Sequence, residues 1–179
     1  MRSRTLLGLA FAVCLALAMA VAAPLARAAG NCTAVAGTIL GHYDFDGPEG
    51  PAWYGWAYLT FGKDPTVWSA RLVDLNDGYR ANPYKANFAG YEILTYTIDG
   101  VGSFQTNSHF LCTAGATPNF CGFSEEGAVD PEAGTGLFEG MSGSIASRGE
   151  AGWGSDPAGP TPDQPWLWIA QLTGTLCKK

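Results

Sequence analysis

Basic side chains are scarce in this sequence, and their scarcity removes whole classes of partner. The chain has 10 lysines and arginines against 16 aspartates and glutamates. Three of the arginines lie in the first 28 residues, so from residue 29 onward seven basic side chains stand against 16 acidic ones, a formal charge of −9. Phosphate backbones and anionic lipid repel so acidic a chain. We therefore expect neither nucleic acid nor, beyond residue 28, a membrane as partner.

Long apolar runs are also missing, except at the very start. Arg2 and Arg4 precede an almost continuous apolar stretch over residues 6–23, and Ala26-Arg27-Ala28 follows as a small-x-small cleavage pattern. This order is typical of a secretory signal peptide, and an uncleaved membrane anchor is the alternative. We expect residues 1–28 to be a signal peptide, residues 29–179 to form one domain, and the protein to be secreted or periplasmic.

Cysteine is sparse beyond residue 28, and no Cys-x-x-Cys pair occurs. The four cysteines are Cys32, Cys112, Cys121 and Cys177, and both histidines stand far from them in the sequence. An even number in an exported chain favours disulfides over a zinc site, although four cysteines allow three pairings. Cys112 and Cys121 flank a turn-rich segment, and the other two lie at chain ends that a closed barrel would bring together. We expect Cys112–Cys121 and Cys32–Cys177, with no metal and no cofactor.

Helical periodicity is nearly absent, and short β-rich segments separated by turn residues fill the chain. Asp99-Gly100 is typical of a two-residue hairpin turn. We expect strands over residues 35–45, 53–61, 67–75, 91–98, 102–112, 137–146 and 166–177, with a loop over 149–165. Seven or eight short strands without repeats or a linker indicate one all-β domain, either a sandwich or a barrel.

The glycine-rich stretch from Gly134 to Ile145 favours the barrel. Glycine inside a strand usually marks a bulge, a bend or the close approach of another backbone, and a sheet that closes tightly needs such places. We predict a single closed antiparallel barrel of about eight strands, stapled by disulfides. In this barrel Gly140 and Gly143 occupy positions where a β-carbon would collide with a neighbouring strand or require an unfavourable backbone angle.

This order of elements resembles the calycin-like barrels of the allene oxide cyclase and dirigent group. The resemblance covers roughly residues 90–177 and rests mainly on Gly134-Thr135-Gly136-x-Phe138-x-Gly140-x-x-Gly143, which follows the Asp-Gly hairpin. It implies an eight-stranded barrel with an apolar interior, whose members bind small hydrophobic molecules and steer their cyclisation or coupling. The family's catalytic glutamate does not align with any named position here, so no catalytic residue is carried over.

Glu92 is the candidate catalytic carboxylate, because it lies on the clearest predicted strand. Alternation puts Glu92 and Tyr96 on one face and Tyr91 and Ile93 on the other, and both faces carry apolar residues, so the facing is unresolved. Inside a barrel, desolvation would raise the pKa of Glu92 and suit it to general acid or base catalysis. Outside the barrel, Glu92 would be an ordinary surface residue.

Aromatic residues carry the binding prediction. Core packing is the first explanation for them, because such side chains fill barrels that hold no ligand. The alternatives are a ring that lines a cavity or, for exposed rings, a platform that stacks on sugars. For an open lumen, we expect the ligand-binding residues to be Trp56, Tyr58, Tyr96 and Trp168. His109 lies in a row of polar residues that favours the solvated face, and His42 fits a polar outer edge.

Three function classes stay open. The one we favour is an exported barrel that binds a small hydrophobic molecule and steers its cyclisation or coupling, in which case any catalysis would be cofactor-free and cyclase- or isomerase-like. The second is a non-catalytic module that binds carbohydrate or protein. The third is a structural or inhibitory protein with a filled core. The sequence does not determine the oligomeric state.

Overall fold

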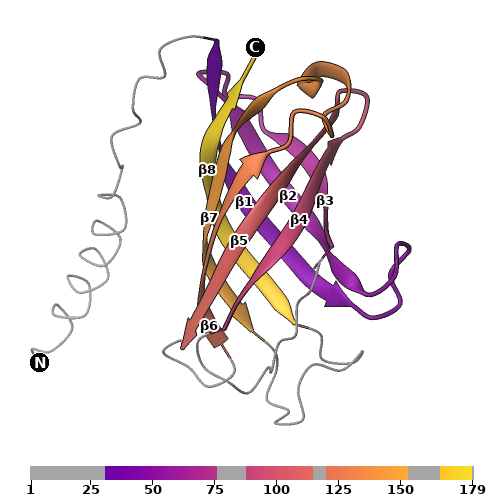
Figure 1. Ribbon diagram of the computed structural model, residues 1–179, viewed down its shortest axis with the longest axis vertical. Coiled ribbons are helices and arrows are strands. Elements are labelled where there is room, and N and C mark those ends of the chain that lie inside the picture. The colour runs from indigo at the N-terminus through magenta and orange to yellow at the C-terminus, as the bar shows by residue number, and fades with distance from the viewer. Residues whose placement is uncertain (1–30, 76–87, 115–119, 153–165, 179) are drawn as a thin grey trace, which may run out of the picture.

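Eight antiparallel strands close into one barrel in the computed structural model, which describes residues 31–75, 88–114, 120–152 and 166–178 (Figure 1). Each strand pairs with the next along the chain, and β8 pairs back onto β1. In chain order the strands are β1 (Cys32–Asp44), β2 (Ala52–Phe61), β3 (Trp68–Leu75), β4 (Phe88–Ile98), β5 (Gly102–Ala114), β6 (Phe120–Val129), β7 (Ser142–Gly152) and β8 (Leu167–Cys177). The predicted all-β barrel is confirmed, and the predicted signal peptide lies outside the described residues.

The two chain ends meet where the barrel closes. Cys32 is the register partner of Cys177, and the two form a disulfide at the end of the barrel that we call the mouth. A second disulfide, Cys112–Cys121, joins β5 to β6 near the opposite end. Both predicted pairings are confirmed. Two disulfides are typical of a protein that folds in an oxidising compartment.

Two predicted boundaries are wrong. The sequence pattern predicts no strand over residues 120–129, yet β6 forms there. The strand predicted over 137–146 is displaced, because residues 136–138 form a 3-10 turn and β7 runs from Ser142 into the predicted loop. Gly136 and Gly140 have φ values of 59° and 68°, a left-handed conformation that interrupts an extended strand.

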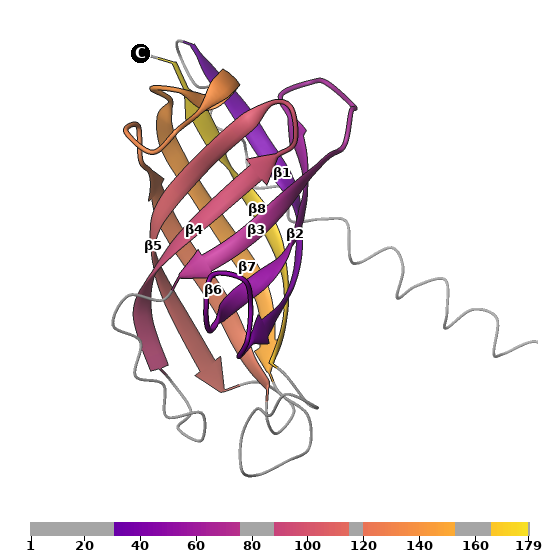
Figure 2. The same ribbon diagram turned by 90° about the vertical axis from the view of Figure 1, so that its right-hand side faces the viewer.

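The connection between β6 and β7 folds back over the mouth. The backbone N–H of Thr135 donates to the carbonyl of Ser103 at 2.8 Å, and the N–H of Leu137 donates to the carbonyl of Val101 at 3.1 Å. These bonds fix the connection to the β4–β5 hairpin at the upper end of the barrel in Figure 2. They also place the buried ring of Phe138 against Phe104 in the lumen. The segment therefore acts as a partial plug.

Gly143 confirms the expected close approach of strands. Its φ is 146°, and a β-carbon at this position would overlap the backbone carbonyl of Thr175 on β8. Gly140 also has a positive φ but faces open space, so it meets the angle condition and not the collision. The tight seam between β7 and β8 therefore depends on Gly143.

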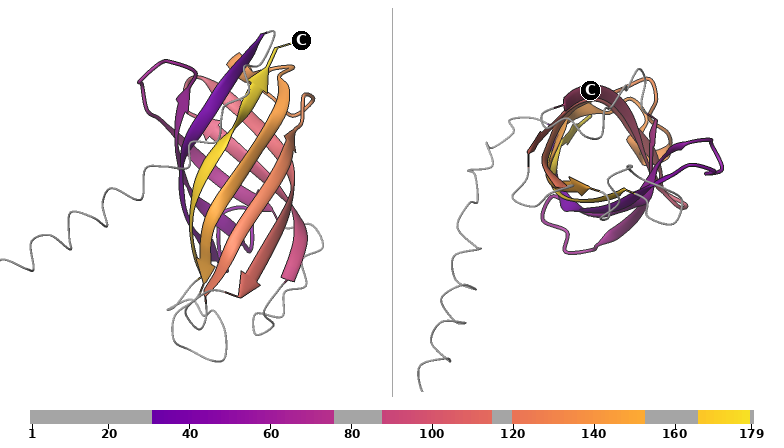
Figure 3. Two further views of the ribbon diagram at one scale, coloured as in Figure 1. Left: turned by 90° about the vertical axis from the view of Figure 1, so that its left-hand side faces the viewer. Right: turned by 90° about the horizontal axis from the view of Figure 1, so that it is seen from below.

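Alternate side chains of each strand point into the barrel and form its core. The view along the barrel in Figure 3 shows the strands as one continuous ring. The wall formed by β8, β1 and β2 contributes mainly small and aliphatic side chains, whose buried members include Ala170, Leu172, Val35, Ile39, Ala57 and Leu59. Within the described residues, no helix is long and apolar enough to cross a membrane.

Candidate functional site

Three acidic side chains are buried inside the barrel, on the wall opposite the aliphatic strands. Asp74 on β3, Glu92 on β4 and Glu125 on β6 are 2%, 4% and 1% exposed. We call them the lumenal carboxyl cluster. Aspartate and glutamate are almost never fully buried without a partner, because the charged form loses its hydration. The cluster is therefore the most costly arrangement in the described structure.

Hydroxyl groups supply part of the missing hydration. Ser147 Oγ donates to Glu125 Oε2 at 2.8 Å, and the Ser108 hydroxyl, which also lies near Glu125, donates to Thr106 Oγ1 at 3.1 Å. The carboxyls of Asp74 and Glu92 are close neighbours, and a hydrogen bond between them requires that one of the two carries a proton. Gly127 makes room for this network, because a β-carbon there would overlap Ser108 Oγ.

The network leaves each carboxyl incompletely satisfied. Asp74 Oδ1, Glu92 Oε1 and Glu125 Oε1 have no hydrogen-bond partner among the residues that the structure describes. The Tyr96 hydroxyl lies near Thr106 but makes no well-formed hydrogen bond. A buried acceptor without a partner costs about 1–3 kcal/mol, so several together call for an explanation such as a bound molecule or ordered water.

Burial controls the protonation of the cluster. Desolvation raises the pKa of all three carboxyls, and the neighbouring acids raise that of Glu92 further. The neighbouring hydroxyls of Ser147 and Ser108 oppose this rise in the pKa of Glu125. We conclude that the cluster holds protons at pH values where surface carboxyls have lost theirs. It can therefore donate as well as accept hydrogen bonds near neutral pH.

Two aromatic clusters enclose the carboxyl cluster. Toward the mouth, the rings of Tyr96 and Phe104 stack at a centroid distance of 4.6 Å, and Phe138 packs on Phe104 at 5.2 Å. Toward the opposite end, a distal cluster with ring separations from 5.2 to 6.2 Å consists of Phe110, Phe123, Trp53, Trp166 and Trp168. On β5, Thr106 and Ser108 lie between Phe104 and Phe110. The polar residues thus form a layer between two aromatic layers.

A small apolar pocket lies at the mouth beside the Phe138 plug. Its volume is about 230 Å³, and its walls include Phe61, Trp68, Ile98, Val101, Met141 and Leu176. These residues come from the ends of the strands and from the turns between them. The pocket is therefore an apolar hollow at the same end of the barrel as Cys32–Cys177.

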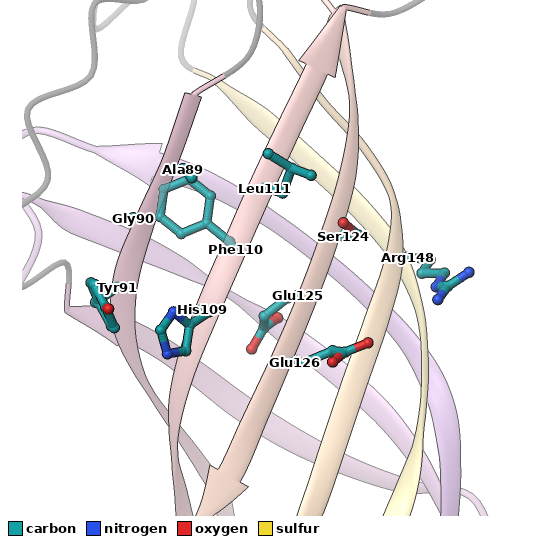
Figure 4. Close-up of a pocket in the computed structure, with 10 residues that line it drawn as sticks. All are labelled: Ala89, Gly90, Tyr91, His109, Phe110, Leu111, Ser124, Glu125, Glu126 and Arg148. Atoms are coloured by element: carbon teal, nitrogen blue, oxygen red, sulfur yellow. The ribbon is translucent and has the colours of Figure 1, made fainter.

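A wider groove of about 740 Å³ crosses the outer face of strands β4–β7. The rings of Tyr91 and His109 lie 4.1 Å apart in it, with Glu126 and Arg148 on the neighbouring strands (Figure 4). Glu125 and Glu126 are consecutive, and Figure 4 shows both carboxyl groups on β6. Glu126 is exposed on the outer face, whereas Glu125 is buried. His109 thus lies on the solvated face that the sequence pattern favours.

The structure separates the residues predicted to bind a ligand. Glu92, Tyr96 and Trp168 are buried in the lumen, so the unresolved facing of β4 is decided. Trp56 and Tyr58 are 47% and 41% exposed on the outer surface, and the prediction that they line the lumen is wrong. Both faces of β2 are rich in large apolar residues, so alternation alone could not select the inner one.

Sequence reasoning missed two of the three lumenal acids. Asp74 falls at the end of the strand predicted over residues 67–75, next to turn residues, where nothing indicates that its side chain faces the lumen. Glu125 lies in the strand that was not predicted. A signal for Glu125 did exist, because Cys121, Phe123 and Val129 alternate with it on one face. The adjacent Glu126 and Gly127 mask that alternation.

Comparison with known proteins finds no match to this chain among family models, curated proteins or solved structures. The resemblance to the allene oxide cyclase and dirigent group therefore stays a prediction. The lumen also departs from the apolar interior that this resemblance implies, because it holds three carboxyls. The function must be argued from the site itself.

Proposed function

We propose that this protein is an exported barrel that binds a small, largely hydrophobic molecule in its lumen. The observation that carries this proposal is the set of three buried carboxyls, each with an unpartnered oxygen, between two aromatic clusters. A protein under no functional constraint gains stability by replacing such groups with apolar ones. Ligand sites have this composition, with mostly apolar and aromatic walls and a few convergent polar groups.

Export is part of the proposal. The N-terminal pattern of residues 1–28 is typical of a signal peptide, and the two disulfides fit an oxidising compartment. The ligand would then be a molecule of the medium or the periplasm. The mouth pocket, lined by Phe61, Val101 and Met141, offers the apolar entry that such a molecule needs.

Tryptophan fluorescence tests the binding proposal. Trp53, Trp166 and Trp168 lie in the distal aromatic cluster, so occupation of the lumen should shift their emission. We expect a saturable shift with some members of a panel of aromatic and polyunsaturated ligands. The variant Trp56→Phe, altered on the outer surface, should keep the shift. Native mass spectrometry of the protein from its own host should show a copurifying small molecule. A native mass equal to that of the protein alone, together with unchanged tryptophan emission across the whole panel, would indicate a filled core and a structural or inhibitory role.

A steering role in cyclisation or coupling is the catalytic extension of this proposal. The neighbouring pair Asp74 and Glu92 holds a proton next to unpartnered oxygens, as a general acid requires. With a substrate identified by copurification, Glu92→Gln should lower turnover while Glu150→Gln, altered on the outer surface, should not. Turnover in Glu92→Gln equal to that in Glu150→Gln would show that Glu92 is not the general acid.

The outer surface supports a second candidate, a carbohydrate-binding module. Trp56 and Tyr58 are exposed on one face of β2, and the exposed Leu40 is the register partner of Trp56. Aromatic rings on an open surface suit stacking against sugars. Soluble glycans that bind the wild type and not Trp56→Ala, without affecting the lumenal tryptophans, would favour this candidate.

A further inference from the structure

We infer that the lumen selects an organic cation, a small aromatic molecule with a protonated amine, and that Glu125 is its anchoring carboxylate. This inference rests on the proposed lumenal binding and names the chemical class of the ligand. The lumen combines a buried carboxyl that has an unpartnered oxygen with aromatic clusters on either side of it.

The first support is the imbalance of charge inside the barrel. Three acids are buried together, whereas the basic side chains and histidines of the described residues are all exposed: Lys63, Arg71, Arg148, Lys178, His42 and His109. These residues therefore offer the cluster no buried counter-ion. A neutral ligand that only accepts hydrogen bonds would need a single donor, which the hydroxyl of Tyr96 could provide at lower cost. Three acids exceed that need but match a cation.

The second support is the environment of Glu125. Ser147 donates to one of its oxygens at 2.8 Å, and the Ser108 hydroxyl also lies near the carboxyl. Donors around a carboxyl stabilise its ionised form. The other oxygen, Glu125 Oε1, is buried and has no partner. Glu125 is thus the member of the cluster best placed to ionise when a cation binds.

The third support is the pair of aromatic clusters. Tyr96 and Phe104 stack on one side of the polar layer, and Phe110 and Phe123 stack on the other at 6.0 Å. The face of an aromatic ring attracts a cation by about 0.5–2 kcal/mol, with the larger values where water is excluded. These rings would also pack against the aromatic part of the ligand. A small aromatic molecule with an amine can pair its charge with the polar layer and pack its ring against the aromatic clusters.

Binding of this kind releases a proton. The titratable side chains that face the site are Asp74 from β3, Glu92 and Tyr96 from β4, and Glu125 from β6, and the adjacent strands β5 and β7 present Ser108 and Ser147. Burial keeps the cluster protonated in the free protein, so the balanced reaction is COOH + RNH₃⁺ → COO⁻·RNH₃⁺ + H⁺. The affinity for the amine should therefore rise with pH over the range in which Glu125 of the free protein is still protonated.

Isothermal titration calorimetry with three probes of one shape tests this inference. The probes are 2-phenylethylamine, its neutral counterpart 2-phenylethanol, and the anionic 3-phenylpropanoate. We expect the amine to bind at least about tenfold more tightly than the alcohol, and the anion not to bind. Titration in two buffers of different ionisation enthalpy should show about one proton released per amine.

Variants assign the effect to the lumen. Glu125→Gln should lower amine affinity by about tenfold or more and abolish the proton release, because it removes the only group expected to become anionic. Its neighbour provides the matched control, since Glu126→Gln changes an exposed carboxyl on the same strand and should bind like the wild type. Asp74→Asn gives an independent second variant, and thermal melts show that each variant is folded.

The outcomes separate this inference from the proposed function. Equal affinity for amine and alcohol, or amine binding unchanged in Glu125→Gln, would overturn the cation and leave lumenal binding intact. If none of the three probes binds, the inference of a cationic ligand is also overturned. The wider ligand panel then decides separately whether the lumen binds any molecule.

Discussion

The lumen and the outer surface of this barrel both depart from the usual distribution of side chains, in which apolar residues are buried and polar residues are exposed. The lumen buries Asp74, Glu92 and Glu125, whereas the outer surface exposes an apolar band across β8, β1 and β2 that consists of Leu40, Trp56, Tyr58, Leu167 and Ile169. The costs are unequal. An exposed apolar side chain only forgoes a stabilising contact, whereas a buried acid loses its hydration. The lumen is therefore the region where a compensating function is expected.

Truncation of one tryptophan in each region should give the largest contrast. Trp168 packs on Phe123 and Trp53 inside the barrel, so Trp168→Ala should lower the free energy of unfolding by about 3–5 kcal/mol. Trp56→Ala, on the outer band, should cost less than about 1 kcal/mol. Urea unfolding of both variants measures the difference. Similar losses would mean that the outer band is covered in solution.

The pH dependence of stability should come next in size. The pKa values of the carboxyl cluster are raised in the folded state, so their contribution is fully present below the unfolded pKa of about 4. It is lost as the pH rises toward the folded values, by about 1.4 kcal/mol per pH unit for each carboxyl that stays protonated. Urea midpoints should therefore fall between about pH 5 and pH 7. A midpoint that rises over this range would contradict protonated lumenal acids.

Neutralising a single lumenal acid should produce a smaller, stabilising effect. At neutral pH Glu92→Gln removes a desolvated carboxyl and should raise the free energy of unfolding by about 1–2 kcal/mol, while also reducing the slope with pH. Glu126→Gln on the outer face should change it by less than about 0.5 kcal/mol. Thermal melts at two pH values compare the pair. Destabilisation by Glu92→Gln would show that its ionised form supports the fold.

The smallest effect on the free energy of unfolding is expected when apolar residues of the outer band are replaced by polar ones. Leu40 and Ile169 are register partners on β1 and β8, and both are about half exposed. Leu40→Ser with Ile169→Ser should cost less than about 1 kcal/mol in total and leave lumenal binding unchanged. Leu172→Ser, at a buried position on β8, is the contrasting variant. A large loss from the outer pair, with a change in sedimentation, would reveal self-association through the band.

The fold was largely predictable because its determinants are local or lie at the chain ends. The Asp99-Gly100 turn and the position of Cys32 and Cys177 at the two ends were readable without any tertiary contact. The facing of Glu92 was not, since alternation gives β4 two similar faces. Glu125 was lost for a related reason, because an acid at the centre of the inner face removes the apolar pattern that identifies a strand. The site is thus hardest to predict where its residues depart from the apolar composition of the rest of the core.

The protonation of the lumenal cluster is the central claim, and carboxyl ¹³C NMR tests it most directly. Spectra of the folded protein recorded from about pH 3 to about pH 9 follow each aspartate and glutamate through its own titration. We predict that the carboxyls of Asp74, Glu92 and Glu125 stay protonated in the folded protein at pH values well above about 4, the ordinary range for carboxyls, and that they titrate in that ordinary range once the protein is unfolded. Titration of all the carboxyls in the acidic range would contradict the account.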